Sequence, residues 1–388
     1  MTSILLLALL LLLPNWPGGQ STKQVQSTSP EAERILSEAR AAEAREDWQT
    51  AEQSYLQALK VTPARAEVLV NLGVVYNRAG KTDDAIASFK QASQIKPNLF
   101  AAHLNLGVTY FKGGRFAEAA LPLRRAASIE PENEQARKLL ALSLIALEKF
   151  PEAVEQLEVL NKRQSGEPPI LEALGQSYLR LKLYDQAVRV LEQLVTITPK
   201  SARAHLWLGE ALDNASESER AIVEFRKAIE IDPQLLEANY AMGYALLKRG
   251  DNDQAAKYFE RELEINPAMT LALFHLAKIN LIRGQVDEAA IQLTRIIEAE
   301  PDFRPGLEAL GQALLKKGDA NEAVKVLERA VGLDPKWPDG HVLLGRAYKA
   351  AGRRAEAQRE FDAAQKLSAE ERKRLEQKVT GSKPGKRS

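Results

Sequence analysis

The sequence contains no cysteine, and this absence removes several kinds of chemistry at once. Thiolate catalysis, cysteine-ligated zinc, disulfides and cysteine lipidation are all excluded. Aromatic residues make up only 6% of the 388 residues, which is typical of helices that pack through small side chains. The motifs HExxH, GxSxG and GxGxxG do not occur either. The chain therefore carries no local signature of an enzyme.

Excess charge of either sign is also missing, because the formal net charge is only +1. A chain without a strongly basic balance has no general electrostatic attraction to nucleic acid, and we expect no nucleic-acid partner. The last 24 residues are the exception, since they hold eight lysines and arginines against three glutamates. We expect residues 380–388 to form a basic disordered tail, for which a solvated terminus is the default.

Long hydrophobic runs are scarce, and the longest stands at the start of the chain. Ile4–Leu13 is apolar and is followed by Pro14. Ten residues are too few to span a bilayer as a helix but suit the core of a signal peptide. We therefore expect a signal peptide at 1–19, a polar linker at 20–31, and export to the periplasm or envelope. An uncleaved membrane anchor is the alternative, because no Lys or Arg precedes the run.

The rest of the sequence is organised by a phrase that recurs every 34 residues. Residues 66–97 read AEVLVNLGVVYNRAGKTDDAIASFKQASQIKP. The Leu-Gly pair at 72–73, for example, returns as Leu-Gly at 106–107. A fixed internal period of this kind fixes the whole architecture. Ten units without insertion fill residues 32–371, with starts at 32, 66, 100, 134, 168, 202, 236, 270, 304 and 338.

Each unit has the pattern of two short helices joined by a turn. Apolar residues recur at spacings of three and four, Gly80 interrupts them in the second unit, and Pro97 closes that unit. Glycine at position eight of most units allows a neighbouring helix to approach closely, and alanine occupies position twenty of all ten. Ser368 and Glu371 form a capping-box pattern, which predicts a capping helix at 368–379.

This pattern of small pair, aromatic, turn, alanine and closing proline resembles the tetratricopeptide repeat family. The resemblance implies an all-α, right-handed superhelical solenoid of tandem helix-turn-helix repeats. It also implies a non-enzymatic scaffold or adaptor without cofactor or metal, which binds a peptide or partner segment in its concave groove. Two alternatives stay open: a membrane-tethered scaffold for envelope assembly or secretion, and an accessory subunit that presents substrate to a separate enzyme. The partner's identity and the oligomeric state are not predicted.

In the family, set positions of each first helix line the concave groove, and these positions indicate the candidate binding residues. Asn71 and Asn105 stand in the order Asn-Leu-Gly, which resembles the asparagine ladder of O-linked N-acetylglucosamine transferase repeats. An amide can hold a peptide backbone because it both donates and accepts hydrogen bonds. The middle of the chain instead offers aromatic anchors and their neighbours. These candidates are Trp207, Tyr240, Tyr244, Phe274, His275 and Lys278.

Other unusual residues have plainer interpretations. His103, His205 and His341 all occupy position four of their units, which is typical of a packing site. Gly80-Lys81-Thr82 looks like the end of a phosphate loop, but the glycine that the motif needs five residues earlier is Val75, so we expect a turn. Glu262 stands where other units have alanine or another apolar residue. Membrane contact is expected only through the N-terminal segment or the basic tail.

Overall fold

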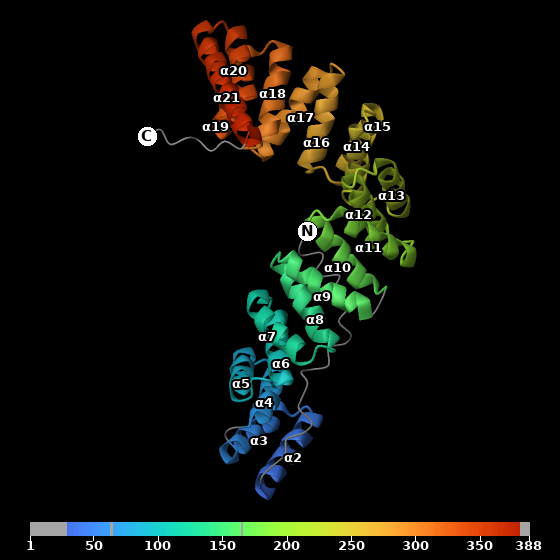
Figure 1. Ribbon diagram of the computed structural model, residues 1–388, viewed down its shortest axis with the longest axis vertical. Coiled ribbons are helices and arrows are strands. Elements are labelled where there is room, and N and C mark those ends of the chain that lie inside the picture. The colour runs from blue at the N-terminus through green and yellow to red at the C-terminus, as the bar shows by residue number, and fades with distance from the viewer. Residues whose placement is uncertain (1–28, 63–64, 164–165, 381–388) are drawn as a thin grey trace. The chain divides into compact units, whose positions relative to one another are not determined.

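The computed structural model describes residues 29–62, 65–163 and 166–380, and this part of the chain is helical throughout, without strands. The described residues form two compact units, the first ending at Glu217 and the second beginning at Ser218. In each unit, helices that follow one another in the sequence pack side by side in a tandem array (Figure 1). The predicted all-α class and the tandem helical arrangement are thereby confirmed.

Helices in both units alternate as the first and second member of each repeat. The first unit contains α2 (Pro30–Ala44), α3 (Trp48–Val61), α4 (Ala66–Arg78), α5 (Thr82–Ile95), α6 (Phe100–Lys112), α7 (Phe116–Ile129), α8 (Glu134–Ala146), α9 (Phe150–Arg163), α10 (Pro168–Arg180), α11 (Tyr184–Ile197) and α12 (Ala202–Asn214). The second unit contains α13 (Ser218–Ile231), α14 (Ala238–Lys248), α15 (Asn252–Ile265), α16 (Thr270–Ile282), α17 (Val286–Ala299), α18 (Arg304–Lys317), α19 (Ala320–Leu333), α20 (Pro338–Ala350) and α21 (Arg354–Thr380).

Two predicted boundaries are corrected by the helices. The separate capping helix at 368–379 does not exist, because α21 continues without a break from Arg354 to Thr380. Ser368 lies inside this helix, so the capping-box pattern does not mark the start of a helix. The unit expected to start at 236 begins its first helix only at Ala238, since Glu237 adopts a left-handed conformation with φ 72°.

The predicted terminal segments fall largely outside the described residues. Residues 1–19 and most of the linker 20–31 are among them, although α2 already begins at Pro30 with the Ser29 hydroxyl accepting from the Ala32 backbone N–H. The tail 380–388 also lies outside, except for Thr380 at the end of α21.

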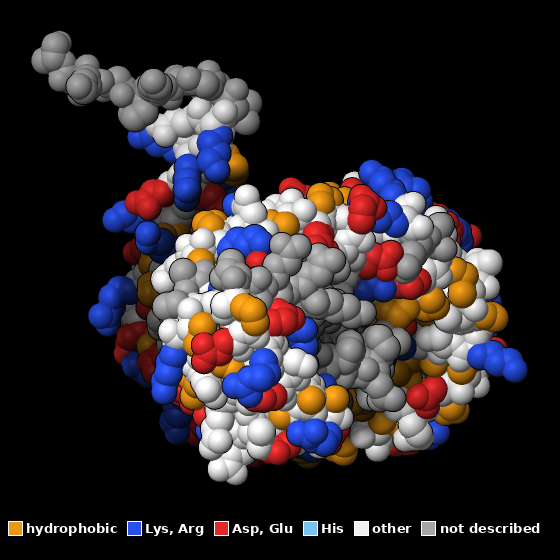
Figure 2. All heavy atoms as spheres, turned by 90° about the horizontal axis from the view of Figure 1, so that it is seen from below, with side chains coloured by type: hydrophobic (Ala, Val, Ile, Leu, Met, Phe, Trp, Pro, Cys, Tyr) orange, Lys and Arg blue, Asp and Glu red, His pale blue; other side chains and the backbone are white. Residues whose placement is uncertain are grey.

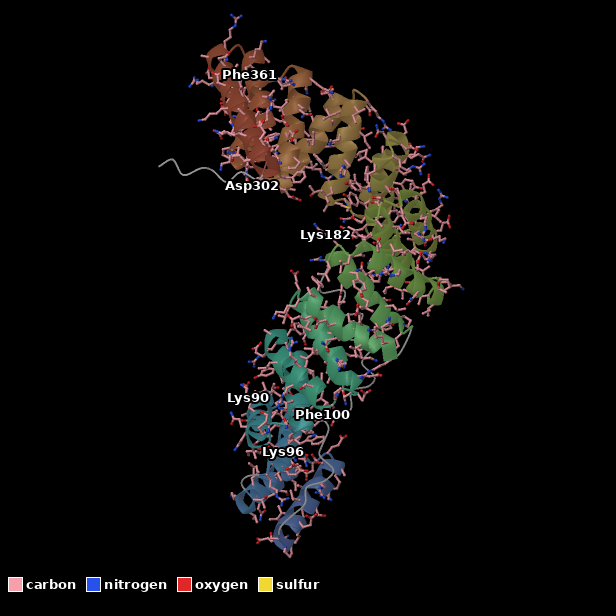
Figure 3. All side chains as sticks on the ribbon, in the orientation of Figure 1. Lys90, Lys96, Phe100, Lys182, Asp302 and Phe361 are labelled. Carbon is pink, nitrogen blue, oxygen red and sulfur yellow. The ribbon has the colours of Figure 1, made fainter. Side chains whose placement is uncertain are left out.

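Glycine at position eight brings the two helices of a repeat into contact. A Cβ placed on Gly73 would lie 2.5 Å from Cε1 of Phe89, sixteen residues further on. A Cβ on Gly345 would meet Phe361 of α21 (Figure 3) at 2.6 Å. The expected close approach is present, and the alanines at position twenty are buried in every repeat. Small residues thus set the spacing within each pair.

The turn between the two helices of a repeat uses the same backbone conformation ten times. Position fifteen has a positive φ in every repeat, whether it is glycine, as at Gly80 with φ 77°, or a larger residue, as at Lys182 with φ 58° (Figure 3). Left-handed backbone favours glycine, so four repeats hold Glu, Lys or Ser under strain here. Gly80-Lys81-Thr82 is this turn and the start of α5, as the sequence predicted.

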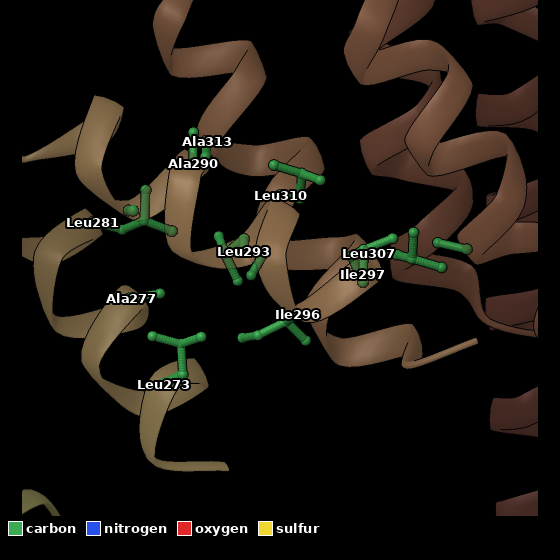
Figure 4. Packing of buried hydrophobic residues seen from close by; sticks show 13 residues of the cluster. Leu273, Ala277, Leu281, Ala290, Leu293, Ile296, Ile297, Leu307, Leu310 and Ala313 are labelled. Carbon is green, nitrogen blue, oxygen red and sulfur yellow. The ribbon is translucent and has the colours of Figure 1, made fainter. Parts of the chain in front are cut away.

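Apolar side chains fill the space between consecutive repeats. Figure 4 shows one such cluster, in which Leu273 and Leu281 of α16, Leu293 of α17 and Leu310 of α18 are buried together. Because each cluster involves only neighbouring helices, the core is continuous along a unit instead of being gathered at one centre.

Charged side chains of both signs are interspersed over the face seen in Figure 2. Several form ion pairs between repeats, such as Lys81 Nζ to Glu52 Oε2 at 2.7 Å. Among the described helices, none has the length and apolar character needed to cross a membrane. Within the same residues, no group of histidine, aspartate and glutamate side chains is arranged to hold a metal ion.

Candidate functional site: an aromatic cluster in the second unit

Five of the predicted binding residues lie together in the second unit. Tyr240 and Tyr244 come from α14, one helical turn apart, and Phe274, His275 and Lys278 come from α16, the first helix of the next repeat. We call these five residues the aromatic cluster. They are brought together because α14 and α16 occupy the same place in consecutive repeats.

The rings of the aromatic cluster are in direct contact. Tyr240 and Tyr244 stack with centroids 6.1 Å apart, and His275 lies 5.3 Å from Tyr244 and 6.1 Å from Tyr240. Phe274 meets the His275 ring edge-on at 5.5 Å, while Lys278 Nζ stands 5.6 Å from the Phe274 centroid. These separations are within the range of favourable aromatic and cation–π contacts.

The aromatic cluster is open on one side and closed on the other. The Tyr244 side chain is 39% exposed, and Tyr240, Phe274 and His275 are partly buried. Beneath them lies Phe259 of α15, which is fully buried and stacks on His275 at 5.5 Å. Phe259 supports the site, although it is not among the groove positions from which the candidates were chosen. It could have been found from the sequence, because the residue that faces the position-eight glycine is large in every repeat.

Burial sets the protonation state of the histidine. Loss of solvent, with a smaller contribution from Lys278, lowers the pKa of His275 to about 4, so the imidazole is neutral at pH 7. Burial and the neighbouring Tyr244 raise the pKa of Tyr240 to about 12, so its hydroxyl stays protonated. The aromatic cluster therefore presents neutral rings with polar tips, and Lys278 supplies its positive charge.

An unusual carboxylate holds the start of α14 in place. Glu262 of α15 is fully buried, and its two oxygens accept hydrogen bonds from the backbone N–H groups of Glu237 (2.8 Å) and Tyr240 (3.2 Å). These N–H groups belong to the first turn of α14, where a helix has no partners of its own. Burial and the Glu262 charge raise the pKa of Glu237. Glu262 thus caps a helix from outside it and positions Tyr240.

The two asparagines of the predicted ladder do not belong to the aromatic cluster. Asn71 and Asn105 lie in α4 and α6 of the first unit, with exposures of only 1% and 2%. The Asn71 amide hydrogen-bonds to the Tyr55 hydroxyl, which also donates to Glu43. Both amides therefore belong to the packed interior between helices. Contact with a peptide through them stays a prediction that would require these helices to separate.

Trp207 is the remaining candidate, and it belongs to the first unit. It lies on α12, partly buried, with the Arg203 guanidinium 5.9 Å from its ring centroid. The structure does not assign it to the aromatic cluster. The site that the described contacts support is the one formed by α14 and α16.

Family models match the chain over most of its length. The model for the cilia and flagella-associated protein 70 C-terminal domain matches residues 17–234, more than half of the chain. Two tetratricopeptide repeat models match residues 240–303 and 314–376. A comparison with curated proteins gives no match.

Several solved structures are similar to the chain at low sequence identity. The structure of Naa15/Naa10 bound to HypK-THB is 18% identical, covers 87% of this chain with a TM-score of 0.50, and is itself covered over 64% of its length. YrrB, described as a TPR protein with an unusual peptide-binding site, is 21% identical, with 49% of this chain and 97% of YrrB covered and a TM-score of 0.44. Yeast Tom70 is 16% identical, with 87% and 85% covered and a TM-score of 0.41.

Tetratricopeptide repeats generally mediate protein–protein interaction and are generally non-catalytic. The Leu-Gly pairs at 72–73 and 106–107 and the ten left-handed turns lie within the residues that these models match. The chain belongs to the tetratricopeptide repeat family, in the group represented by the cilia and flagella-associated protein 70 C-terminal domain.

Proposed function

We propose that this protein is a non-enzymatic scaffold whose aromatic cluster binds a segment of a partner protein. The observation that carries the proposal is a partly exposed set of four touching rings on two neighbouring first helices. Tyrosine and similar side chains supply large contact areas at small cost in conformational entropy, and such residues dominate binding energy at interfaces. A partner segment with one or two apolar anchor residues would suit these rings.

Polar groups at the edges of the aromatic cluster would add orientation to this contact. The Tyr244 hydroxyl can donate to or accept from a partner backbone, and Lys278 is exposed beside Phe274. The neutral state of His275 keeps the centre of the site free of charge, which favours an apolar side chain there. The absence of a catalytic role is part of the proposal, and it is supported by the helical repeats that occupy the described chain.

The test begins with the full chain as bait in an extract of its own cells. A captured partner would be identified by mass spectrometry, and its binding segment would be synthesised with a fluorescent label. Anisotropy then gives the dissociation constant for the wild type, for Tyr244→Ala/Phe274→Ala, and for the control Ile282→Ala. Ile282 lies on the same helix as Phe274 and is 69% exposed. Circular dichroism would verify that each variant is folded.

Loss of two anchors of this type should weaken binding by about 30-fold or more, whereas the control should change it less than about twofold. Equal affinity of the wild type and the double variant would refute the proposed site. A separate Trp207→Ala variant tests whether the first unit contributes to partner binding. Asn71→Ala and Asn105→Ala test whether the two asparagines contribute.

Export to the periplasm or envelope is also a proposal. It rests on the apolar run Ile4–Leu13, which lies outside the described residues. The intact mass of the protein from its native cells tests it, since cleavage near residue 19 would remove that run. A full-length mass in the membrane fraction would favour the tethered scaffold instead.

A further inference from the structure

A cleft opens on the second unit between α13 and α15, and it shares no residue with the aromatic cluster. Its volume is about 370 Å³. One wall is the face of α15 that carries Gln254, Lys257, Tyr258 and Arg261 at spacings of three and four. Ile229 of α13 and Pro233 of the following loop form the other wall, and Asn239 of α14 completes the lining.

At four other joints between repeats, a long side chain at position four reaches back to the preceding repeat. It donates a hydrogen bond to the backbone carbonyl of the proline that closes the preceding repeat. The pairs are His103 to Pro97 (2.9 Å), Arg137 to Pro131 (3.2 Å), His205 to Pro199 (3.1 Å) and His341 to Pro335 (3.1 Å). The position-four histidines are therefore structural, as their spacing indicated.

A second arrangement uses an arginine from the second helix of the following repeat. Arg295 donates to the Pro267 carbonyl at 3.0 Å, and Arg329 donates to the Pro301 carbonyl at 2.8 Å. Both arginines stand at position twenty-six of their repeats. The carbonyl at such a joint is thus bound by a cationic side chain when no histidine is available.

The joint at Pro233 uses neither arrangement. Asn239 holds position four, is 1% exposed, and its Nδ2 has no hydrogen-bond partner. Asparagine is shorter than histidine or arginine, and the left-handed Glu237 changes the path of the chain just before it. Arg261 stands at position twenty-six but donates to Glu264 at 2.5 Å. The hydrogen bond that other joints make to the closing proline is replaced here by an open cleft.

The lining of this cleft has the chemistry of a carboxylate site. Lys257 and Arg261 lie one turn apart on the same side of α15, Asn239 Nδ2 is a buried donor without a partner, and no aspartate or glutamate lines the cleft. The Tyr258 ring, Ile229 and Pro233 add apolar surface. The buried Glu262 carboxylate does not line the cleft, and its two oxygens face the backbone N–H groups of Glu237 and Tyr240.

We propose that this cleft binds an acidic side chain of a partner peptide, together with an aliphatic residue beside it. The carboxylate would accept from Lys257, Arg261 and the Asn239 amide, and Glu264 would lose its bond to Arg261. A buried donor that lacks a partner favours a ligand that supplies the missing acceptor. The volume is near the lower end for ligand pockets, so it suits one or two side chains.

The test uses a fluorescein-labelled peptide, Gly-Ser-Leu-Glu-Leu-Ser-Gly-amide, and its twin with Gln in place of Glu. Anisotropy with the full chain should show the Glu peptide binding at least about tenfold tighter than the Gln peptide. Lys257→Met should weaken the Glu peptide at least about fivefold. Lys325→Met, which removes an exposed lysine of α19, should change its binding less than twofold.

Asn239→His is the decisive variant, because it restores the residue that closes three other joints. It should abolish binding of the Glu peptide while the far-UV spectrum and thermal midpoint are kept. Tyr244→Ala/Phe274→Ala should leave this binding unchanged, so the cleft and the aromatic cluster are tested separately.

Three results would overturn the proposal: equal binding of the two peptides, full binding to a folded Asn239→His variant, or no effect of Lys257→Met. Displacement of the Glu peptide by inorganic phosphate but not by acetate would also overturn it in favour of a phosphate site. If Asn239→His fails to fold, the comparison of Lys257→Met with Lys325→Met decides the question.

Discussion

Replacing Glu262 should loosen the start of α14 more than any other part of the second unit. Its carboxylate is fully buried and binds the backbone N–H groups of Glu237 and Tyr240 at 2.8 and 3.2 Å. No side chain of α14 itself caps these groups. Most other repeats place alanine at this position, so Glu262→Ala introduces a residue that the architecture already accepts.

The magnitude follows from two opposing effects. Each hydrogen bond to a charged group contributes about 1.5–3 kcal/mol, and a buried N–H without a partner costs about 1–3 kcal/mol. Two effects of Glu262→Ala oppose this loss. Release of Glu237 from its left-handed conformation stabilises the folded state by about 1–2 kcal/mol, and removal of a buried charge stabilises it further. We expect Glu262→Ala to destabilise the region by about 1–3 kcal/mol.

Hydrogen exchange measured by mass spectrometry is the suitable assay, since repeat arrays open locally and need not unfold as one unit. Peptides covering residues 234–248 should exchange roughly 5- to 150-fold faster in Glu262→Ala, whereas those of α18 should be unchanged. Glu237→Gly provides a second perturbation. It should stabilise the wild type by about 1 kcal/mol but have little effect beside Glu262→Ala, because the two residues are coupled.

Unchanged exchange at 234–248 in Glu262→Ala would refute the assignment of Glu262 as a cap. Additive effects of Glu262→Ala and Glu237→Gly would refute the idea that the carboxylate holds Glu237 in its strained conformation.

Three further predictions concern single residues. Because the pKa of His275 is lowered to about 4, the unfolded chain binds a proton first as pH falls below about 6.5. The free energy of unfolding should therefore drop by about 1 kcal/mol between pH 7 and 5, a figure that allows for the partial exposure of His275. Urea titrations should show this drop for the wild type but not for His275→Gln. Gly311→Ala should destabilise the protein by about 1–3 kcal/mol, because its Cβ would lie 2.5 Å from Leu327. Gly332→Ala in α19 should instead stabilise it by up to about 1 kcal/mol, because no atom lies within 4 Å of the added Cβ. Changes of the same sign for both variants in thermal unfolding would contradict this reasoning. Lys182→Gly should raise stability by about 1 kcal/mol by relieving φ 58°, and a lower denaturation midpoint would argue against strain at that turn.

Much of this architecture was determined by the sequence alone, because its information is local. A period of 34 residues places the same glycine, alanine and proline at the same points of every repeat, and each repeat packs only on its neighbours. The pairing of Gly73 with Phe89 and the left-handed turn at Gly80 are contacts of this short range. They could be expected from the pattern without knowledge of the rest of the chain.

Tertiary structure decided what departs from the repeat. The sequence marked Glu262 as unusual, but only the folded chain shows it binding N–H groups more than twenty residues away. Asn71 was expected to grip a peptide, whereas packing buries it beside Tyr55. Nothing in the sequence distinguished Asn239, because what sets it apart from the position-four histidines is a missing hydrogen bond, which the folded structure alone shows. A periodic pattern specifies which residues recur, but the fate of an individual polar side chain depends on the distances and burial that packing creates around it.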